Sequence, residues 1–159
     1  FKYSNTTAAT HRLAAELMDI GADYAAINRA MFDIKSRARV ELERLALESM
    51  KFYLGGRCAV MIITNEMVEA SGAKENDMEG LAPLPRQIEG VWVGVTLQKA
   101  DGAFKVSVRT GTHADASAIC VKLGGGGHVC AAGCAMAGPA EDAVARILSV
   151  VAETVEGIR

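Results

Sequence analysis

The chain has 159 residues and a formal net charge of −2; half of its residues are hydrophobic and 23% are charged. This balance is typical of a globular domain with a buried core, and the slightly acidic charge excludes a general electrostatic attraction for nucleic acid. Phosphate groups would have to be bound by a local arrangement of donors. No apolar stretch approaches the roughly 20 residues that cross a bilayer, and no basic and apolar signal segment opens the sequence. We therefore expect no membrane association.

The four cysteines form no CxxC pair and no dense disulfide pattern; they are Cys58, Cys120, Cys130 and Cys134. In a chain with an apolar core of its own, this favours reduced thiols and a cytoplasmic location. Together with His128, the last two cysteines suggest a zinc site, but a fourth ligand at recognisable spacing is missing. Because those two cysteines stand among alanines and glycines, we expect buried free thiols and no metal site.

The first third of the chain has apolar residues at helical spacing. This spacing predicts one helix from Thr7 to about Asp19, a short second helix capped by Asp23, and a third helix from about Ser36 to Tyr53. Polar residues on the remaining faces indicate that these helices are amphipathic. We therefore expect a helical segment ahead of any sheet.

After Gly55 the hydrophobic period changes to that of strands. The expected strands span residues 58–63, 89–98, 104–110 and 134–137, and the expected helices span residues 65–71, 113–122 and a final segment beginning near Pro139. Residues 72–87 form a long polar loop of a kind that is often functional. Asp101-Gly102 indicates a hairpin whose loop is slightly longer than two residues. The sequence therefore predicts an α/β fold with a mixed β-sheet flanked by helices.

A candidate phosphate site lies where a basic strand face meets a run of glycines. Lys105, Ser107 and Arg109 share one face of their strand, because side chains alternate along a strand. A short expected helix separates this strand from the run Gly124, Gly125, Gly126 and Gly127, which His128 follows directly. Backbone N–H groups of a glycine-rich loop, an Arg and a His together suit phosphate oxygens. Gly94, on the neighbouring strand and facing the same way, would leave room for a ligand.

The motifs of hydrolytic centres are missing. The sequence has no carboxylate–histidine cluster with metal spacing, no GxSxG elbow, no P-loop lysine and no catalytic Cys–His signature. We therefore expect no catalytic residue and no metal ligand in this chain, and no hydrolysis by the chain alone.

Three segments of the sequence together resemble a known family. The strand Lys105–Arg109 (KVSVR), the run Leu123–His128 (LGGGGH) and the segment Ala131–Gly133 closely resemble the DHH-associated C-terminal domain of DHH-family phosphoesterases. The resemblance is greatest to the oligoribonuclease and pAp-phosphatase (NrnA) type. The opening FKYSNTT also looks like the end of the catalytic DHH domain, so residues 1–54 would be its helical end with a connecting helix. Residues 55–159 would be the DHH-associated substrate-binding domain.

The resemblance implies a two-domain phosphoesterase with two manganese ions in an N-terminal DHH domain ahead of this chain. Such an enzyme would hydrolyse short oligoribonucleotides, pAp, or linear or cyclic dinucleotides, and would form a homodimer in the cytoplasm. Metal-bound hydroxide would attack phosphorus in that other domain, while this chain holds the substrate. The resemblance assigns substrate binding to Arg109, Gly124, Gly125, Gly126, Gly127 and His128, and also to Ser107, Lys105 and Asn76.

Two other classes of function remain open. Alanyl-tRNA synthetases carry a related glycine-rich C-terminal domain, so the chain could be an RNA-binding or oligomerisation module. Its slightly acidic charge and lack of a basic stripe speak against broad nucleic-acid contact. A ligand-sensing domain with no enzyme attached is the third possibility.

Overall fold

The structure is a computed structural model that describes residues 5–100 and 102–157. Contacts divide the chain into two compact units, Phe1–Ser36 and Arg37–Arg159. The domain boundary expected between residues 54 and 55 stays a prediction. Within the described ranges, no helix is long and apolar enough to cross a bilayer.

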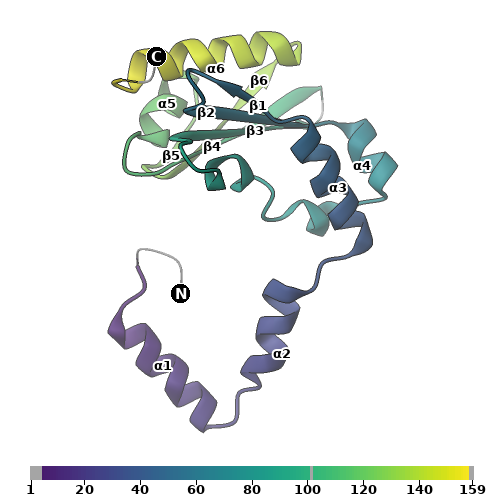
Figure 1. The fold of residues 1–159 in the computed structure, drawn as a ribbon, viewed down its shortest axis with the longest axis vertical. Helices are drawn as coiled ribbons and strands as arrows, with labels where there is room; N and C mark the ends of the chain where they lie inside the picture. The colour runs from purple at the N-terminus through teal and green to yellow at the C-terminus, as the bar shows by residue number, and fades with distance from the viewer. Residues whose placement is uncertain (1–4, 101, 158–159) are drawn as a thin grey trace. The chain divides into compact units, whose positions relative to one another are not determined.

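The first unit consists of short helices whose starts are capped as expected. The hydroxyl of Thr7 accepts a hydrogen bond from the backbone N–H of Thr10, and the carboxylate of Asp23 accepts one from Ala26 at 2.9 Å. These side chains satisfy N–H groups that have no partner within a helix. The two predicted helices are thereby confirmed, and a π-helical turn follows them. The elements are α1 (Ala8–Asp19), α2 (Tyr24–Asn28) and η1 (Arg29–Asp33), and none of their residues is buried (Figure 1).

The second unit is built on a mixed sheet, as predicted, and the sheet has six strands where the sequence indicated four. Its strands lie in the order β1-β2-β3-β4-β6-β5, with β2 and β3 parallel and every other neighbouring pair antiparallel. The strands are β1 (Lys51–Tyr53), β2 (Cys58–Ile63), β3 (Val93–Ala100), β4 (Ala103–Thr110), β5 (Gly126–His128) and β6 (Ala131–Ala137). The apolar run predicted as a central strand is β2, which pairs on both sides and is almost wholly buried.

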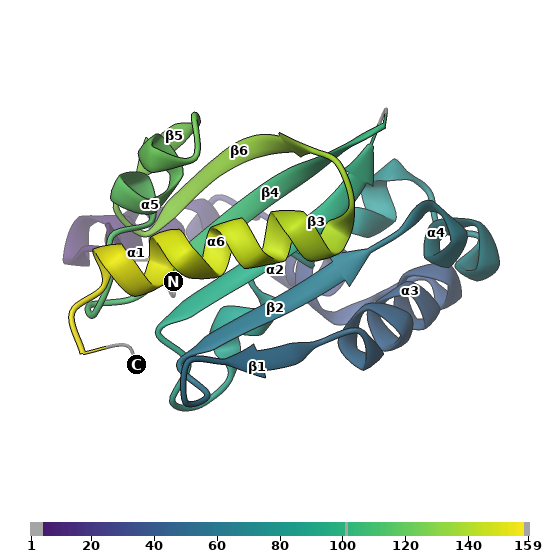
Figure 2. The ribbon, with the colours of Figure 1, turned by 90° about the horizontal axis from the view of Figure 1, so that it is seen from above.

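Helices cover the two faces of the sheet differently. On one face α5 (Ala116–Lys122) and α6 (Ala140–Thr154) enclose the larger core, and Figure 2 shows α6 lying across the strands. The other face is covered by α3 (Arg37–Glu48), α4 (Asn65–Ser71) and two 3₁₀ turns, η2 (Glu75–Met78) and η3 (Leu84–Gln87). These segments form a smaller core with β2. Their main contacts with the sheet are to β2 and β3, so this face is left hollowed at β4 and β6.

The third predicted helix was wrong at its end. The helix stops at Glu48, and Lys51–Tyr53 form the edge strand β1 instead of a further helical turn. Ser49 explains the change: its hydroxyl donates to the carbonyl of Ile62 at 2.8 Å and accepts from the N–H of the same residue at 2.9 Å. This hydroxyl binds the backbone of β2, and the chain then continues alongside that strand. Helical periodicity does not report such a non-local contact.

Other predicted boundaries shift by a few residues. The strand expected from residue 89 begins at Val93, the helix expected from 113 begins at Ala116, and the strand expected from 134 begins at Ala131. Ala100 pairs directly with Ala103, so the hairpin loop is two residues long and shorter than expected. Asp101 itself lies outside the described residues.

Replacing Leu42 with Ala tests the smaller core. Leu42 is fully buried there, so we expect Leu42→Ala to lower the free energy of unfolding by about 2–5 kcal/mol. Leu47→Ala on the same helix is the matched control, because Leu47 is 44% exposed. Urea denaturation measures both changes, and equal losses from the two variants would contradict the assignment of this core.

Candidate functional site

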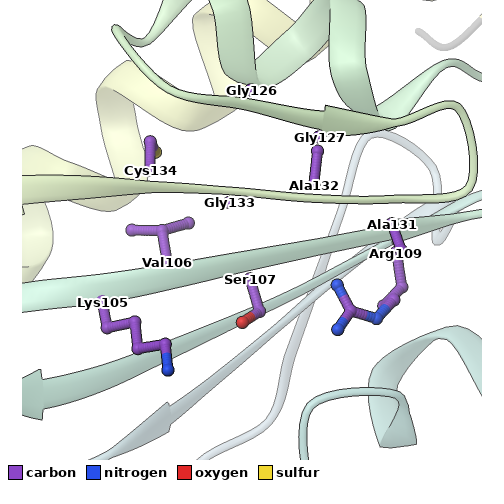
Figure 3. Close-up of a pocket in the computed structure, with 10 residues that line it drawn as sticks. All are labelled: Lys105, Val106, Ser107, Arg109, Gly126, Gly127, Ala131, Ala132, Gly133 and Cys134. Atoms are coloured by element: carbon purple, nitrogen blue, oxygen red, sulfur yellow. The ribbon is translucent and has the colours of Figure 1, made fainter.

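Strand β4 presents its basic residues on the face opposite α6. Phe104, Val106 and Val108 are buried in the larger core, while the residues between them are exposed or half-buried. Figure 3 shows the side chains of Lys105, Ser107 and Arg109 extending to the same side of the strand. The alternation expected from the sequence is therefore confirmed.

The strand register shows which residues of β6 and β5 lie on the same face as Arg109. Arg109 pairs with Ala131 on β6, and Ala131 pairs in turn with His128 on β5. Directly opposite residues in a sheet project to the same face. Arg109 and His128 therefore lie in one row, with only the methyl group of Ala131 between them.

A second row runs parallel to the first. Ser107 pairs with Gly133, and Gly133 pairs with Gly126. Two of these three residues have no side chain, so the floor between β4 and β5 is bare backbone. Such a surface allows a ligand to approach the main chain closely.

These rows form part of a hollow of about 480 Å³ on the sheet. Its lining consists of Lys105, Val106, Ser107, Arg109, Gly126, Gly127, Ala131, Ala132, Gly133 and Cys134 (Figure 3). Five of the nine predicted binding residues are therefore brought together. Gly124, Gly125 and His128 lie beside the hollow without lining it, and Asn76 is exposed on η2 and also outside the lining. The binding roles of all nine stay predictions.

The glycine run is not the open loop that the sequence suggested. The N–H groups of Gly124 and Gly125 donate to carbonyls of Val121 and Cys120, at 3.1 and 2.8 Å, and so cap α5. The next residues form β5, the last strand of the sheet. An edge strand leaves one side of its backbone unpaired by the sheet.

Close packing of β5 on β6 explains two of these glycines. A Cβ on Gly125 would fall well inside 3.0 Å of the carbonyl oxygen of Gly133, and one on Gly127 would lie 2.6 Å from the Cα of Ala132. Gly126, between them, has open space. The turn after β5 is held at its base, because the hydroxyl of Thr110 donates to the carbonyl of Val129 at 2.9 Å.

The charge of the hollow is positive. Lys105 and Arg109 contribute cations, and no residue in its lining is acidic. The guanidinium of Arg109 donates to the carbonyl of Val108 at 3.1 Å, which neutralises no charge. Charge-assisted hydrogen bonds from an arginine suit the oxygens of phosphate or carboxylate groups. The hollow is therefore chemically suited to an anion.

The space over Gly94 is occupied, which corrects one expectation. The sequence suggested that Gly94 leaves room for a ligand, but a Cβ there would lie 2.5 Å from the backbone nitrogen of Arg86. Arg86 belongs to η3 and was missed by the sequence reasoning. The sequence signals the position of Arg86 only through Gly94 and Gly111. Neither glycine has a positive φ, so the backbone does not require glycine at these positions.

The cysteines differ from one another in exposure. Cys58 and Cys120 are buried. Of the two cysteines that were expected to be buried, Cys134 is half-buried and Cys130 is exposed, so the expectation was wrong for Cys130. A hydrogen bond between Cys120 and Cys134 raises the pKa of the Cys120 thiol and lowers that of Cys134. Among the described residues, no group of three or more His, Cys, Asp or Glu side chains is placed to hold a metal ion.

Comparison with known proteins shows the family. The DHHA1 domain family matches residues 55–157. The chain belongs to this family. It is also 37% identical over 155 residues to the bifunctional oligoribonuclease and PAP phosphatase NrnA of Thermus thermophilus, covering 96% of this chain and 46% of that protein. This agrees with the resemblance found in the sequence.

Solved structures share the fold of the DHHA1 chain. An exopolyphosphatase-related protein from Bacteroides fragilis superimposes with a TM-score of 0.87 at 25% identity, covering 96% of this chain and 45% of that one. A pGpG-specific phosphodiesterase from Vibrio cholerae superimposes with a TM-score of 0.53 at 16% identity, covering 93% of this chain and 53% of that one. The chain thus spans about half the length of the relatives it matches.

Alanine substitutions in the glycine run test the close packing of β5. Gly125→Ala would force a methyl group into the backbone of β6, so we expect it to lower the free energy of unfolding by about 1–3 kcal/mol. Gly126→Ala meets nothing within 4 Å and should stay within about 0.5 kcal/mol of the parent. Thermal or urea denaturation compares the two variants, and a Gly125→Ala protein as stable as Gly126→Ala would disprove this packing.

Proposed function

We propose that the chain is the substrate-holding part of a manganese-dependent DHH-family phosphoesterase that hydrolyses short oligoribonucleotides, pAp or dinucleotides. The observation that carries the proposal is the hollow beside β4, where Arg109, Lys105 and Ser107 face a floor of small residues. The family and the similarity to an oligoribonuclease and PAP phosphatase support the same class of substrate.

The geometry supports a division of roles among the residues. The guanidinium of Arg109 would donate two hydrogen bonds to phosphate oxygens, and the hydroxyl of Ser107 would donate a third. His128, in the same row as Arg109, would close the far side. The bare backbone at Gly126 and Gly133 would let the nucleotide lie close to the sheet. Holding one end of the substrate fixes the position of its scissile bond, and this would limit the length of the substrate.

The metal ions would be held elsewhere in the protein. Following the resemblance to DHH-family phosphoesterases, we place both manganese ions in the part of the DHH domain that lies ahead of residues 1–54. When bound there, they would supply the activated water for hydrolysis. The residues of this chain would bind and orient the phosphate.

The helices of the first unit expose an apolar surface that another part of the protein could cover. Its short helices leave large apolar side chains exposed, including Leu13 at 57%, Met31 at 68% and Phe32 at 68%. An exposed group of this kind marks an interaction surface in a protein of ordinary composition. We propose that this surface packs on the rest of the DHH domain, to which residues 1–54 would belong, and that the whole enzyme is a homodimer in the cytoplasm.

Removing the guanidinium of Arg109 tests the proposed site. In the full-length protein, Arg109→Ala should weaken binding of adenosine 3′,5′-bisphosphate by about tenfold or more, because a charge-assisted hydrogen bond contributes about 1.5–3 kcal/mol. Calorimetric titration measures the affinity, and a manganese-dependent assay with pAp and di- to pentanucleotides measures turnover.

Arg146→Ala is the matched control, since Arg146 is exposed on α6 on the opposite face of the sheet. It should bind the ligand as the parent does. Wild-type affinity and turnover in Arg109→Ala would contradict the site. Tight binding of tRNA with no binding of short nucleotides would favour an RNA-binding module of the alanyl-tRNA synthetase kind.

A further inference from the structure

Arg86 lies across the same face of the sheet as the hollow. Its backbone rests directly on β3 at Gly94, where an added Cβ would lie 2.5 Å from its nitrogen and 2.8 Å from its own Cβ. Its guanidinium reaches the end of β4, where a Cβ on Gly111 would fall well inside 3.0 Å of Nη2. Arg86 therefore spans two strands at positions that carry no side chain.

The two glycines are explained by Arg86 and by nothing in their own backbone. Neither Gly94 nor Gly111 has a left-handed φ, so both positions would accept alanine conformationally. Only the close approach of Arg86 excludes a side chain there. The sheet surface is thus shaped to hold this arginine in one position.

The guanidinium held in this way is not electrostatically satisfied. Its Nε atom is buried and has no hydrogen-bond partner in the part of the chain that the structure describes, and no ion pair is found there for Arg86. Burying a donor of a charged group without a partner is costly. An anion bound to the guanidinium from outside the chain would neutralise its charge and offset part of this cost.

Arg109 is the immediate neighbour of this position. Gly94 is the direct register partner of Arg109, and Gly111 follows Arg109 by two residues along the chain. Both glycines under Arg86 therefore flank Arg109 on the same face. Two arginines thus occupy neighbouring positions on this face, and within residues 5–100 and 102–157 no ion pair with a carboxylate is found for either.

We propose that Arg86 and Arg109 together clamp a terminal phosphomonoester, so that Arg86 makes the site prefer substrates with a terminal phosphate over those with only internal phosphodiesters. This inference rests on the proposed function. A phosphomonoester carries a charge of about −1.5 to −2 at pH 7 and three terminal oxygens. A phosphodiester carries one charge and two such oxygens. Two adjacent guanidinium groups, each a rigid fork of donors, match the monoester.

The test compares two ligands that differ by one terminal phosphate: the diadenylate ApA and its 5′-phosphorylated form pApA. Calorimetric titration of the full-length protein should show tighter binding of pApA. Arg86→Met keeps the aliphatic volume and removes the charge. It should weaken pApA binding about tenfold, as expected for the loss of a charge-assisted hydrogen bond, and leave ApA binding unchanged. Arg146→Met, on the opposite face, is the control and should change neither affinity.

A second variant displaces Arg86 without removing its charge. Gly111→Ala places a methyl group where Nη2 lies, and a flexible side-chain end can move away while the fold is kept. It should reduce the preference for pApA in the same way as Arg86→Met. Combining the two substitutions should cause no further loss, because both remove the same contact.

Each outcome separates the inference from the proposed function. If wild-type protein binds pApA and both variants keep its full preference over ApA, the role of Arg86 is wrong and the site itself stands. Equal losses for pApA and ApA in variants with unchanged melting temperature would also overturn selection of the terminal phosphate. Failure of the wild-type protein to bind either ligand would overturn the proposed function and this inference together.

Discussion

The antiparallel register of β3, β4, β6 and β5 determines what the site can be. It aligns Gly94, Arg109, Ala131 and His128 in one row across four strands. A slip of one residue in β4 would turn Arg109 into the larger core and expose Val108, and the burial of three apolar residues on β4 opposes that slip. The core on one face thus fixes the chemistry of the other. The proposed anion site is therefore a consequence of how the sheet is packed.

A second constraint is that segments of the chain pack closely at positions where only glycine leaves enough space. Gly125 and Gly127 let β5 pack on β6, while Gly94 and Gly111 let Arg86 lie on the sheet. In each case an added Cβ would meet atoms that already fill the space. Glycine in this protein therefore acts less as a flexible hinge than as a place where two backbones, or a backbone and an arginine, come into contact. No large side chain of the described residues fills the hollow, because β6, which lies between β4 and β5, also carries small residues there.

Local signals in the sequence predicted much of the fold. The alternation on β4, the apolar run of β2 and the caps at Thr7 and Asp23 all depend on neighbours within a few residues, and the structure confirms them. The features that the sequence did not predict depend on residues far apart in the chain. The edge strand β1 follows from hydrogen bonds of Ser49 to Ile62, thirteen residues away. Arg86 lies on this face only because β3 and β4 pair beneath it, so no local pattern could place it there.

The central claim is that a nucleotide phosphate is held on the hollowed face of the sheet. A crystal structure of the full-length protein with adenosine 3′,5′-bisphosphate tests this claim most directly. The account predicts one phosphate in the hollow, within hydrogen-bond distance of the Arg109 guanidinium and of the backbone of β5. A nucleotide bound only at another surface, such as the groove between β1 and α6 lined by Tyr53 and Leu148, would contradict it.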